Sequence, residues 1–331
     1  FMTSRFLPAA ALVAASVLAL AGCAGGATGE QTGDGKLQVV ASTNVYGDIA
    51  ATIGGDRVEV SSIINSVTQD PHSYEATARD RLTVQKADLV IENGGGYDAF
   101  IDTLLQDAKD PHVVTAVEYS HDFPGNEGHE EGEADAEEHD HDHAEGEEGH
   151  EGHNHIEGFN EHVWFDPHTM IHVVEAIAEE LTELSPADAA TFETNLDEFT
   201  AGIAELEASL ATLDSAHGGT EIFVTEPVPP SPPDAAGLAN AAPQAFTQAA
   251  AAGPDVPPAT PPEALKLLRS GTVKAVVANA QTGGAETTEV LNEADTAGIP
   301  VVEFTETLPD DQTYLSWMQS NLEPLTAAPA P

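Results

Sequence analysis

The sequence predicts an α/β fold of two lobes, each with a mostly parallel sheet, joined by one long connecting helix. Two observations predict it. Short apolar segments typical of buried strands alternate with helical segments before about residue 168 and again after about residue 219. A much longer amphipathic segment lies between these two regions. With 331 residues, the chain is also long enough to form two domains with separate hydrophobic cores.

The expected N-terminal lobe covers residues 37–167. Each of its apolar strand segments is followed by a helical segment, which is the pattern of βαβ units and makes the strands parallel. The strands are expected at residues 36–43, 58–64, 88–94 and 112–118, and the helices at residues 45–54, 78–87 and 97–108. An insertion at about residues 120–158 interrupts this lobe.

Residues 168–218 are expected to form a helical linker that includes the long connecting helix. One helix is predicted at residues 167–184 and a second at about 186–214, with Ser185 as N-cap and Pro186 at its first position. At 1.5 Å per residue the second helix would be roughly 40 Å long, enough to connect two lobes. Apolar residues recur in it every three or four positions and predict one buried face. They are Phe192, Leu196, Phe199, Ile203, Leu206 and Leu210.

The expected C-terminal lobe covers residues 219–331 and repeats the alternation. Its strands are expected at residues 221–226, 273–280 and 299–306, and its helices at residues 262–270, 285–298 and 313–325. Residues 227–262 hold half of the 22 prolines, so little helix is expected there.

The N-terminal segment is typical of an exported lipoprotein. Arg5 precedes the apolar run LPAAALVAASVLAL, which is too short to span a membrane but suits the core of a signal peptide. The following LAGC resembles the lipobox of bacterial lipoproteins. We therefore expect a signal peptide at residues 1–22, a lipid on Cys23 and a flexible tether at residues 23–36. An ordinary cleavage site beside an incidental cysteine is the alternative. Cys23 is the only cysteine, so the fold must hold without an intrachain disulfide.

The chain is extremely acidic. It has 10 Lys and Arg against 57 Asp and Glu, a formal net charge of −47. Such a surface repels nucleic acid and anionic lipid headgroups and attracts cations. A nucleic-acid partner is therefore excluded. The charge alone does not identify a metal-binding protein, because a solvated, exported surface has the same composition.

Of four metal-ligating candidates, three lie near expected strand ends. Ligands of open α/β sheets bind beyond the carboxyl ends of the strands. His72 follows the second strand, His162 lies in NEHVWFDP before a helix, and Glu226 and Glu306 end two strands of the C-terminal lobe. Two imidazoles and two carboxylates from both lobes can converge on a cleft as a zinc or manganese site. The ordinary alternatives are a surface loop for His72 and a helix cap or strand end for Glu226 and Glu306.

Residues 121–155 hold eight of the 14 histidines, interleaved with acids and glycines. Low hydrophobicity and high charge cannot offset the entropy of ordering, so we expect a disordered tract whose metal sites are weak and accessory. Such a tract would concentrate metal near the cleft or sense plentiful metal, and its histidines favour zinc over manganese. A merely solvated loop is the alternative. The accessory ligands are expected to be His129, His139, His141, His143, His150, His153 and His155.

A set of motifs in a fixed order resembles a known family. The order is LAGC, DPHSYE, the His-rich insertion, EHVWFDP, the long helix, VTEPV, NAQT, GIPVVEFTETLP and TYLSWM. Over nearly its whole mature length the chain resembles the zinc/manganese solute-binding lipoproteins of bacterial ABC importers. The resemblance implies a metal between two lobes held by His72, His162, Glu226 and Glu306. One departure is PVPPSPPDAAGL, where the family usually has a helix containing aromatics. It affects the expected geometry at Glu226 more than at the other ligands.

These observations predict a non-enzymatic, monomeric receptor that is lipid-anchored to the outer face of the cell membrane. It would capture zinc, or alternatively manganese, and deliver it to an ABC permease and its ATPase. Two readings from other classes stay open: a metal-buffering surface lipoprotein, and a secreted zinc-dependent hydrolase that uses one glutamate as base. The sequence has no H-E-x-x-H motif, and two lobes joined by one helix suit a clamp better than a hydrolase.

Overall fold

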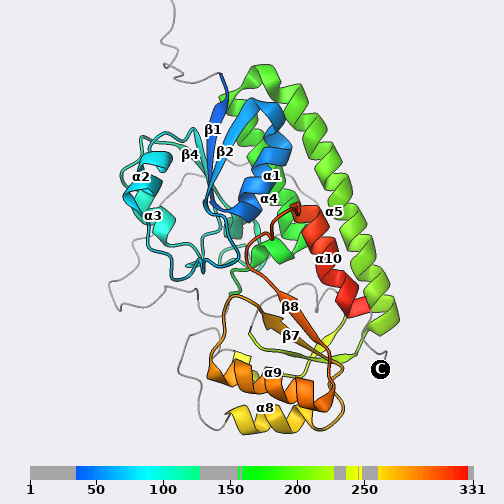
Figure 1. Cartoon of the computed structure of the whole chain (residues 1–331). Coiled ribbons are helices and arrows are strands. Elements are labelled where there is room, and N and C mark those ends of the chain that lie inside the picture. The colour runs from blue at the N-terminus through cyan, green and yellow to red at the C-terminus, as the bar shows by residue number, and fades with distance from the viewer. Residues whose placement is uncertain are drawn as a thin grey trace, which may run out of the picture. The chain divides into compact units, whose positions relative to one another are not determined.

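Two four-stranded sheets form the centres of the two lobes (Figure 1). The computed structural model describes residues 35–126, 156, 159–226, 236–244, 246–247 and 260–326. Every strand pair in both sheets is parallel. Parallel neighbours need long crossover connections, and in the described parts of the chain a helix lies between most successive strands. The predicted α/β fold with two parallel sheets and a long helix is therefore confirmed.

The first sheet has the strand order β2-β1-β3-β4. Its strands are β1 (Leu37–Thr43), β2 (Val58–Ile64), β3 (Leu89–Glu92) and β4 (His112–Thr115), and its helices are α1 (Asn44–Gly54), α2 (Ala78–Val84) and α3 (Phe100–Leu105). Every predicted element is present, but β3, β4, α2 and α3 are shorter than expected. The backbone N–H groups of Asn93 and Gly94 donate to the Asp98 carboxylate, which stabilises a turn after β3 instead of further strand or helix.

The second sheet has the order β6-β5-β7-β8. Its strands are β5 (Glu221–Val224), β6 (Ala239–Asn240), β7 (Ala275–Asn279) and β8 (Val301–Phe304), with the helices α8 (Thr260–Leu268), α9 (Ala285–Ala297) and α10 (Tyr314–Thr326). Helices α8 and α9 lie side by side (Figure 1). Strand β6 was not predicted. Two residues are too few to show a strand period, and they become a strand only by pairing with β5.

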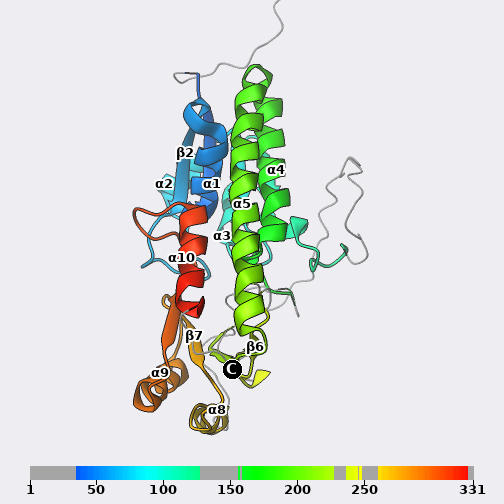
Figure 2. The same cartoon turned by 90° about the vertical axis from the view of Figure 1, so that its right-hand side faces the viewer.

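Two helices separate the sheets along the chain, α4 (Pro167–Leu184) and α5 (Ala189–His217). They pack side by side, and α10 packs against α5 (Figure 2). The prediction that Ser185 caps the long helix was wrong. Residues Pro186–Asp188 form a separate 3-10 turn, and the Ser185 hydroxyl donates to the Asp188 carboxylate at 2.7 Å. Because Ser185 stabilises this turn, α5 begins three residues later than expected.

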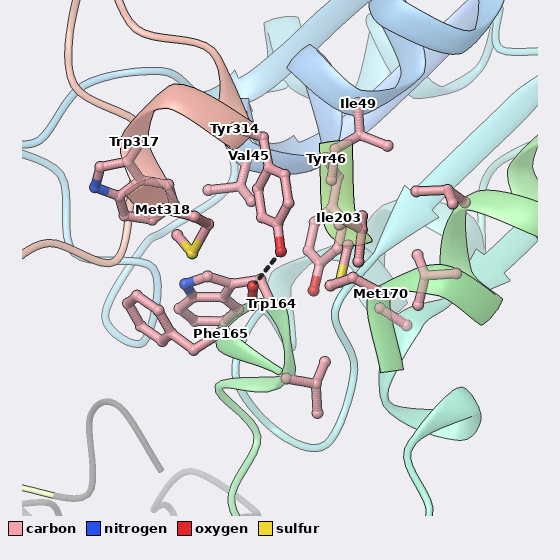
Figure 3. Close-up of a cluster of buried hydrophobic side chains, with 14 of the residues drawn as sticks. Val45, Tyr46, Ile49, Trp164, Phe165, Met170, Ile203, Tyr314, Trp317 and Met318 are labelled. Carbon is pink, nitrogen blue, oxygen red and sulfur yellow. Dashed lines mark hydrogen bonds between the residues drawn. The ribbon is translucent and has the colours of Figure 1, made fainter. Parts of the chain in front are cut away.

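The largest hydrophobic cluster contains side chains from both sheets and from α4, α5 and α10. Within it Phe165 packs against both Trp164 and Trp317, and the Tyr314 hydroxyl donates to the Trp164 carbonyl at 2.7 Å (Figure 3). This shared core makes the residues from Lys36 onward one compact unit. The short turn directly after His162 is therefore held rigidly.

Several predicted features lie outside the described residues. They are the signal peptide at residues 1–22, Cys23, most of the tether, and the seven accessory histidines from His129 to His155. Within the described parts of the chain, no helix combines the length and the apolar character needed to span a membrane.

Candidate metal centre

Three of the four predicted ligands meet in the structure. The ligand atoms of His72, His162 and Glu306 all lie within 4.8 Å of one another. The Nε2 atom of His72 is 3.4 Å from Oε2 of Glu306, and Nε2 of His162 is 4.0 Å from Oε1 of Glu306. A tetrahedral zinc ion with bonds of about 2.1 Å places its ligand atoms about 3.4 Å apart. The three side chains are thus close to the spacing that such an ion requires.

The loop after β2 presents His72 through a turn organised by Asp70. The Asp70 carboxylate accepts the backbone N–H of His72 at 2.9 Å and the Ser73 hydroxyl at 2.7 Å. The imidazole packs edge-on against the Tyr97 ring, with centroids 4.9 Å apart. In the DPHS segment, Asp70 and Ser73 therefore shape the turn, and His72 points at Glu306.

The orientation of His162 is set by Asn160. The Oδ1 atom of Asn160 contacts both the backbone N–H of His162 at 3.0 Å and its Nδ1 atom at 2.8 Å. An amide oxygen can only accept, so Nδ1 must carry the proton. The lone pair is then on Nε2, the nitrogen that faces Glu306. A hydrogen bond to the remote ring nitrogen is the usual way in which proteins orient a metal-binding histidine.

Glu306 is 1% exposed and lies in the turn after β8. The Asn279 amide donates to its Oε1 atom, and its backbone N–H donates to Gln281 at 2.6 Å. Burial alone would raise the pKa of Glu306, but the hydrogen bond from His72 and the nearby imidazoles lower it overall. Burial alone would likewise lower the pKa of His72, and Glu306 raises it. Glu306 is therefore an anionic ligand at neutral pH.

Glu226 lies beside this group but outside its 4.8 Å limit. It follows β5 and is 5% exposed, and its Oε2 atom accepts the Thr282 hydroxyl at 2.6 Å. Burial, reinforced by the charge of Glu306, raises the pKa of Glu226 to about 7. The charge of His72 acts in the opposite direction and lowers the pKa of Glu226. Glu226 is thus close enough to the centre to interact with the charges of Glu306 and His72, while its carboxylate is hydrogen-bonded to Thr282.

Four polar residues that support the centre were not predicted: Asn160, Asn279, Gln281 and Thr282. Three of them follow or end β7, at the carboxyl end of a parallel strand. Ligands of open α/β sheets bind beyond the carboxyl ends of the strands, and this rule, which led to Glu226 and Glu306, applies equally to β7. The NAQT segment could therefore have been predicted as part of the site. For Asn160 the only available signal was its position two residues before His162.

Comparisons with known proteins identify the family. A family model described as "ZnuA: Zinc-uptake complex component A periplasmic" matches residues 39–328. The chain is 29% identical over 202 residues to the manganese ABC transporter substrate-binding lipoprotein PsaA of Streptococcus anginosus, which covers 58% of this chain and 56% of PsaA. It is 29% identical over 182 residues to the zinc-binding lipoprotein AdcA of Streptococcus pneumoniae, which covers 55% of this chain and 34% of AdcA. The chain therefore spans about half or less of the length of these relatives.

A solved structure supports the fold. The periplasmic zinc-binding protein TroA from Treponema pallidum superimposes with a TM-score of 0.68 at 18% identity, covering 90% of this chain and all of TroA. At that identity the likeness concerns the fold, and the family follows from the sequence model, which matches most of the chain. The described residues, from β1 to α10, fall almost entirely within the matched range. Its sequence therefore makes this chain a member of the ZnuA family, whose model is described as the periplasmic component A of a zinc-uptake complex.

Proposed function

We propose that this protein captures zinc outside the cytoplasm and delivers it to an ABC permease, with manganese as the alternative cargo. The observation that carries the proposal is the meeting of His72, His162 and Glu306 within 4.8 Å at a buried place between the two sheets' carboxyl ends. The family is described as part of a zinc-uptake complex, and the relative PsaA is named a substrate-binding lipoprotein of an ABC transporter.

Zinc is the metal that this donor set favours. Imidazole nitrogens suit zinc, whereas a site for manganese relies more on carboxylate and water oxygens. With Glu226 turned toward the ion, two imidazoles and two carboxylates complete a tetrahedral cage. Such a closed site leaves no position for a reacting water, which supports carriage rather than catalysis. One relative is named for manganese and another for zinc, so both metals belong in the test.

The lipid anchor and the transport partners form part of the same proposal. Lipidation of Cys23 would hold the protein at the outer face of the membrane, where a permease powered by its ATPase accepts the metal. The relatives PsaA and AdcA are both named lipoproteins, which supports the anchor. We propose that the protein acts as a monomer, because the three ligands that meet all come from one chain.

The first prediction tests the ligands by thermal melts with and without one equivalent of zinc or manganese. Metal that binds only the folded state stabilises it by about 4 kcal/mol at a thousandfold excess over Kd. His72→Ala, His162→Ala and Glu306→Ala should each lose most of the zinc-induced rise in Tm. His168→Ala, which removes an exposed histidine of α4, should keep it.

Glu226→Ala decides the fourth position. A reduced zinc shift is expected if Glu226 turns from Thr282 to the ion. A full shift in this variant, with the other three lost, would show that the cage has three protein ligands. A larger and tighter response to manganese than to zinc would overturn the choice of zinc while leaving metal carriage in place.

The second prediction concerns the accessory tract. Deleting residues 127–155 should leave one tight metal equivalent per chain and remove several weak ones, because the proposed tight ligands all lie outside the deletion. Titration calorimetry of the deleted and full-length chains measures both classes. Loss of the tight phase would place the principal site in the tract and contradict the proposed centre.

A further inference from the structure

A second group of metal-ligating side chains lies on β4 of the first sheet and on α4. His112, Glu180 and Glu183 each offer a ligand atom, and these atoms lie within 4.8 Å of one another. His112 is the first residue of β4, whereas the candidate centre lies beyond the carboxyl ends of the parallel strands. The second group is therefore at the opposite end of the sheet and shares no residue with the candidate centre.

The backbone holds these three residues in place. The His112 N–H donates to the Asp88 carbonyl at 3.0 Å, and His112 pairs in register with Leu89 of β3. Glu180 and Glu183 are three residues apart on α4, so they lie on one face of the helix. Helix α4 packs against β4 and buries Ile177 and Leu181 in the core. The site thus rests on a strand and a well-packed helix rather than on loops.

Two of the three side chains are in contact. The Nδ1 atom of His112 is in direct hydrogen-bonding contact with Oε2 of Glu180. Glu183 approaches from the next turn and is not needed for that contact. A simple strand-to-helix hydrogen bond would require Glu180 alone, so the presence of a second carboxylate within reach is the feature that points to a cation.

The chemistry of the group suits a divalent transition metal. One neutral imidazole and two carboxylates carry two negative charges, and water can complete the coordination of an ion such as zinc. The sequence has no Lys or Arg between Lys109 and Lys266, so neither α4 nor α5 supplies a basic side chain that would compete for the two glutamates.

We propose that His112, Glu180 and Glu183 form a second site for zinc or a similar divalent transition-metal ion, linking the start of β4 to α4. It binds more weakly than the candidate centre. The side chains of His112 and Glu180 are 38% and 28% exposed, and water competes for such ligands more than at the buried centre. The site does not depend on the proposed transport role.

The test measures the reactivity of His112 in the full-length chain. Diethylpyrocarbonate modifies accessible imidazoles, and peptide mass spectrometry reports the rate at each histidine separately. Free zinc at about ten times the dissociation constant of the site should slow modification of His112 about tenfold, by mass action. Magnesium at the same concentration should have no effect, because it prefers oxygen ligands and keeps its water.

Two variants separate a metal site from a hydrogen bond. Glu183→Gln keeps the contact between His112 and Glu180 but should abolish the protection by zinc and lower the bound zinc by one equivalent in equilibrium dialysis. Glu175→Gln, an exposed change two turns earlier on α4, should keep both. Equal protection of His112 in Glu183→Gln and the parent chain, or no protection at any zinc concentration that leaves the chain folded, overturns the proposal. Glu180→Gln should likewise lower the zinc bound per chain by one equivalent in equilibrium dialysis.

Discussion

Buried carboxylates of this chain differ in pKa according to the groups that face them. Glu306 faces two imidazoles, and its pKa is lowered despite burial. Glu92, at the end of β3, faces Asp98 and Asp102 instead. Burial first, and then these carboxylates, raise the pKa of Glu92 to about 8. The Thr115 hydroxyl donates to Glu92 at 2.9 Å but does not offset these effects.

The third prediction follows from Glu92. Its folded-state pKa lies above the ordinary value of 4.5, so the folded chain binds a proton that the unfolded chain has released. The stability that the folded chain gains from a protonated Glu92 is fully present below about pH 4.5 and is lost as the pH rises toward 8. The effect of Glu92→Gln on the free energy of unfolding, relative to the parent chain, should therefore be more favourable at pH 8 than at pH 5. The difference should be at least about 1 kcal/mol, since one pKa unit corresponds to about 1.4 kcal/mol.

Urea unfolding at pH 5 and pH 8 measures this difference. The exposed Glu207→Gln on α5 is the matched control and should show the same pH dependence as the parent chain. If Glu92→Gln also followed the parent at both pH values, Glu92 would not be protonated in the folded state.

At the scale of elements, α5 shows how far a periodic pattern predicts burial. Of the predicted stripe, Phe192, Phe199, Ile203, Leu206 and Leu210 are buried. Leu196 is only partly buried, and Leu213 extends the buried face by one turn. The period identifies the face of the helix, whereas the neighbours α4, α1 and α10 decide how deeply each position is covered.

The fourth prediction concerns Ile203, at the middle of this face and fully buried (Figure 3). Ile203→Ala should destabilise the protein by about 2–5 kcal/mol, because it removes buried carbon atoms and leaves a cavity between packed elements. Leu82→Ala, at a position of α2 that is 58% exposed, should change stability by less than about 0.5 kcal/mol. Chemical denaturation of both variants checks the contrast. A loss below about 1 kcal/mol for Ile203→Ala would mean that the surrounding helices close the cavity.

At the scale of the whole molecule, Gln281 connects the two lobes at the candidate centre. Its Nε2 atom donates to the Gln69 carbonyl in the loop that carries His72. Its Oε1 atom accepts the backbone N–H groups of Glu306 and Thr307. A second bridge pairs the Asn44 amide with the backbone of Leu308 in both directions. The ligand-bearing segments of the two lobes are thus joined by side chains that do not bind the metal themselves.

The fifth prediction tests this connection. Gln281→Ala should weaken zinc binding by about 10–100-fold, the usual effect of removing a residue that orients a metal ligand. Gln319→Ala, an exposed change of the same type on α10, should leave the affinity unchanged. Competition with a zinc chelator measures both affinities. Parent-like affinity in Gln281→Ala would show that the lobes position Glu306 without this bridge.

The sequence predicted most of the fold and three members of the candidate centre because those features are local. Strand and helix periods, and polar residues directly after strands, can be recognised in short windows, as with β2, α4 and the position of His72. The two-residue strand β6 and the 3-10 turn at Pro186 could not be recognised in this way, since they depend on pairing and on one side-chain contact.

By itself the sequence determined the alternation of strands and helices, the buried face of α5, and the residue types available at the strand ends. Only the tertiary structure decided which of these residues meet. It set the tautomer of His162 through Asn160, turned Glu226 toward Thr282, and brought His112 to Glu180 across 68 residues of sequence. The physical reason is that a distance between side chains depends on how elements pack, whereas residue type and periodicity act within each element.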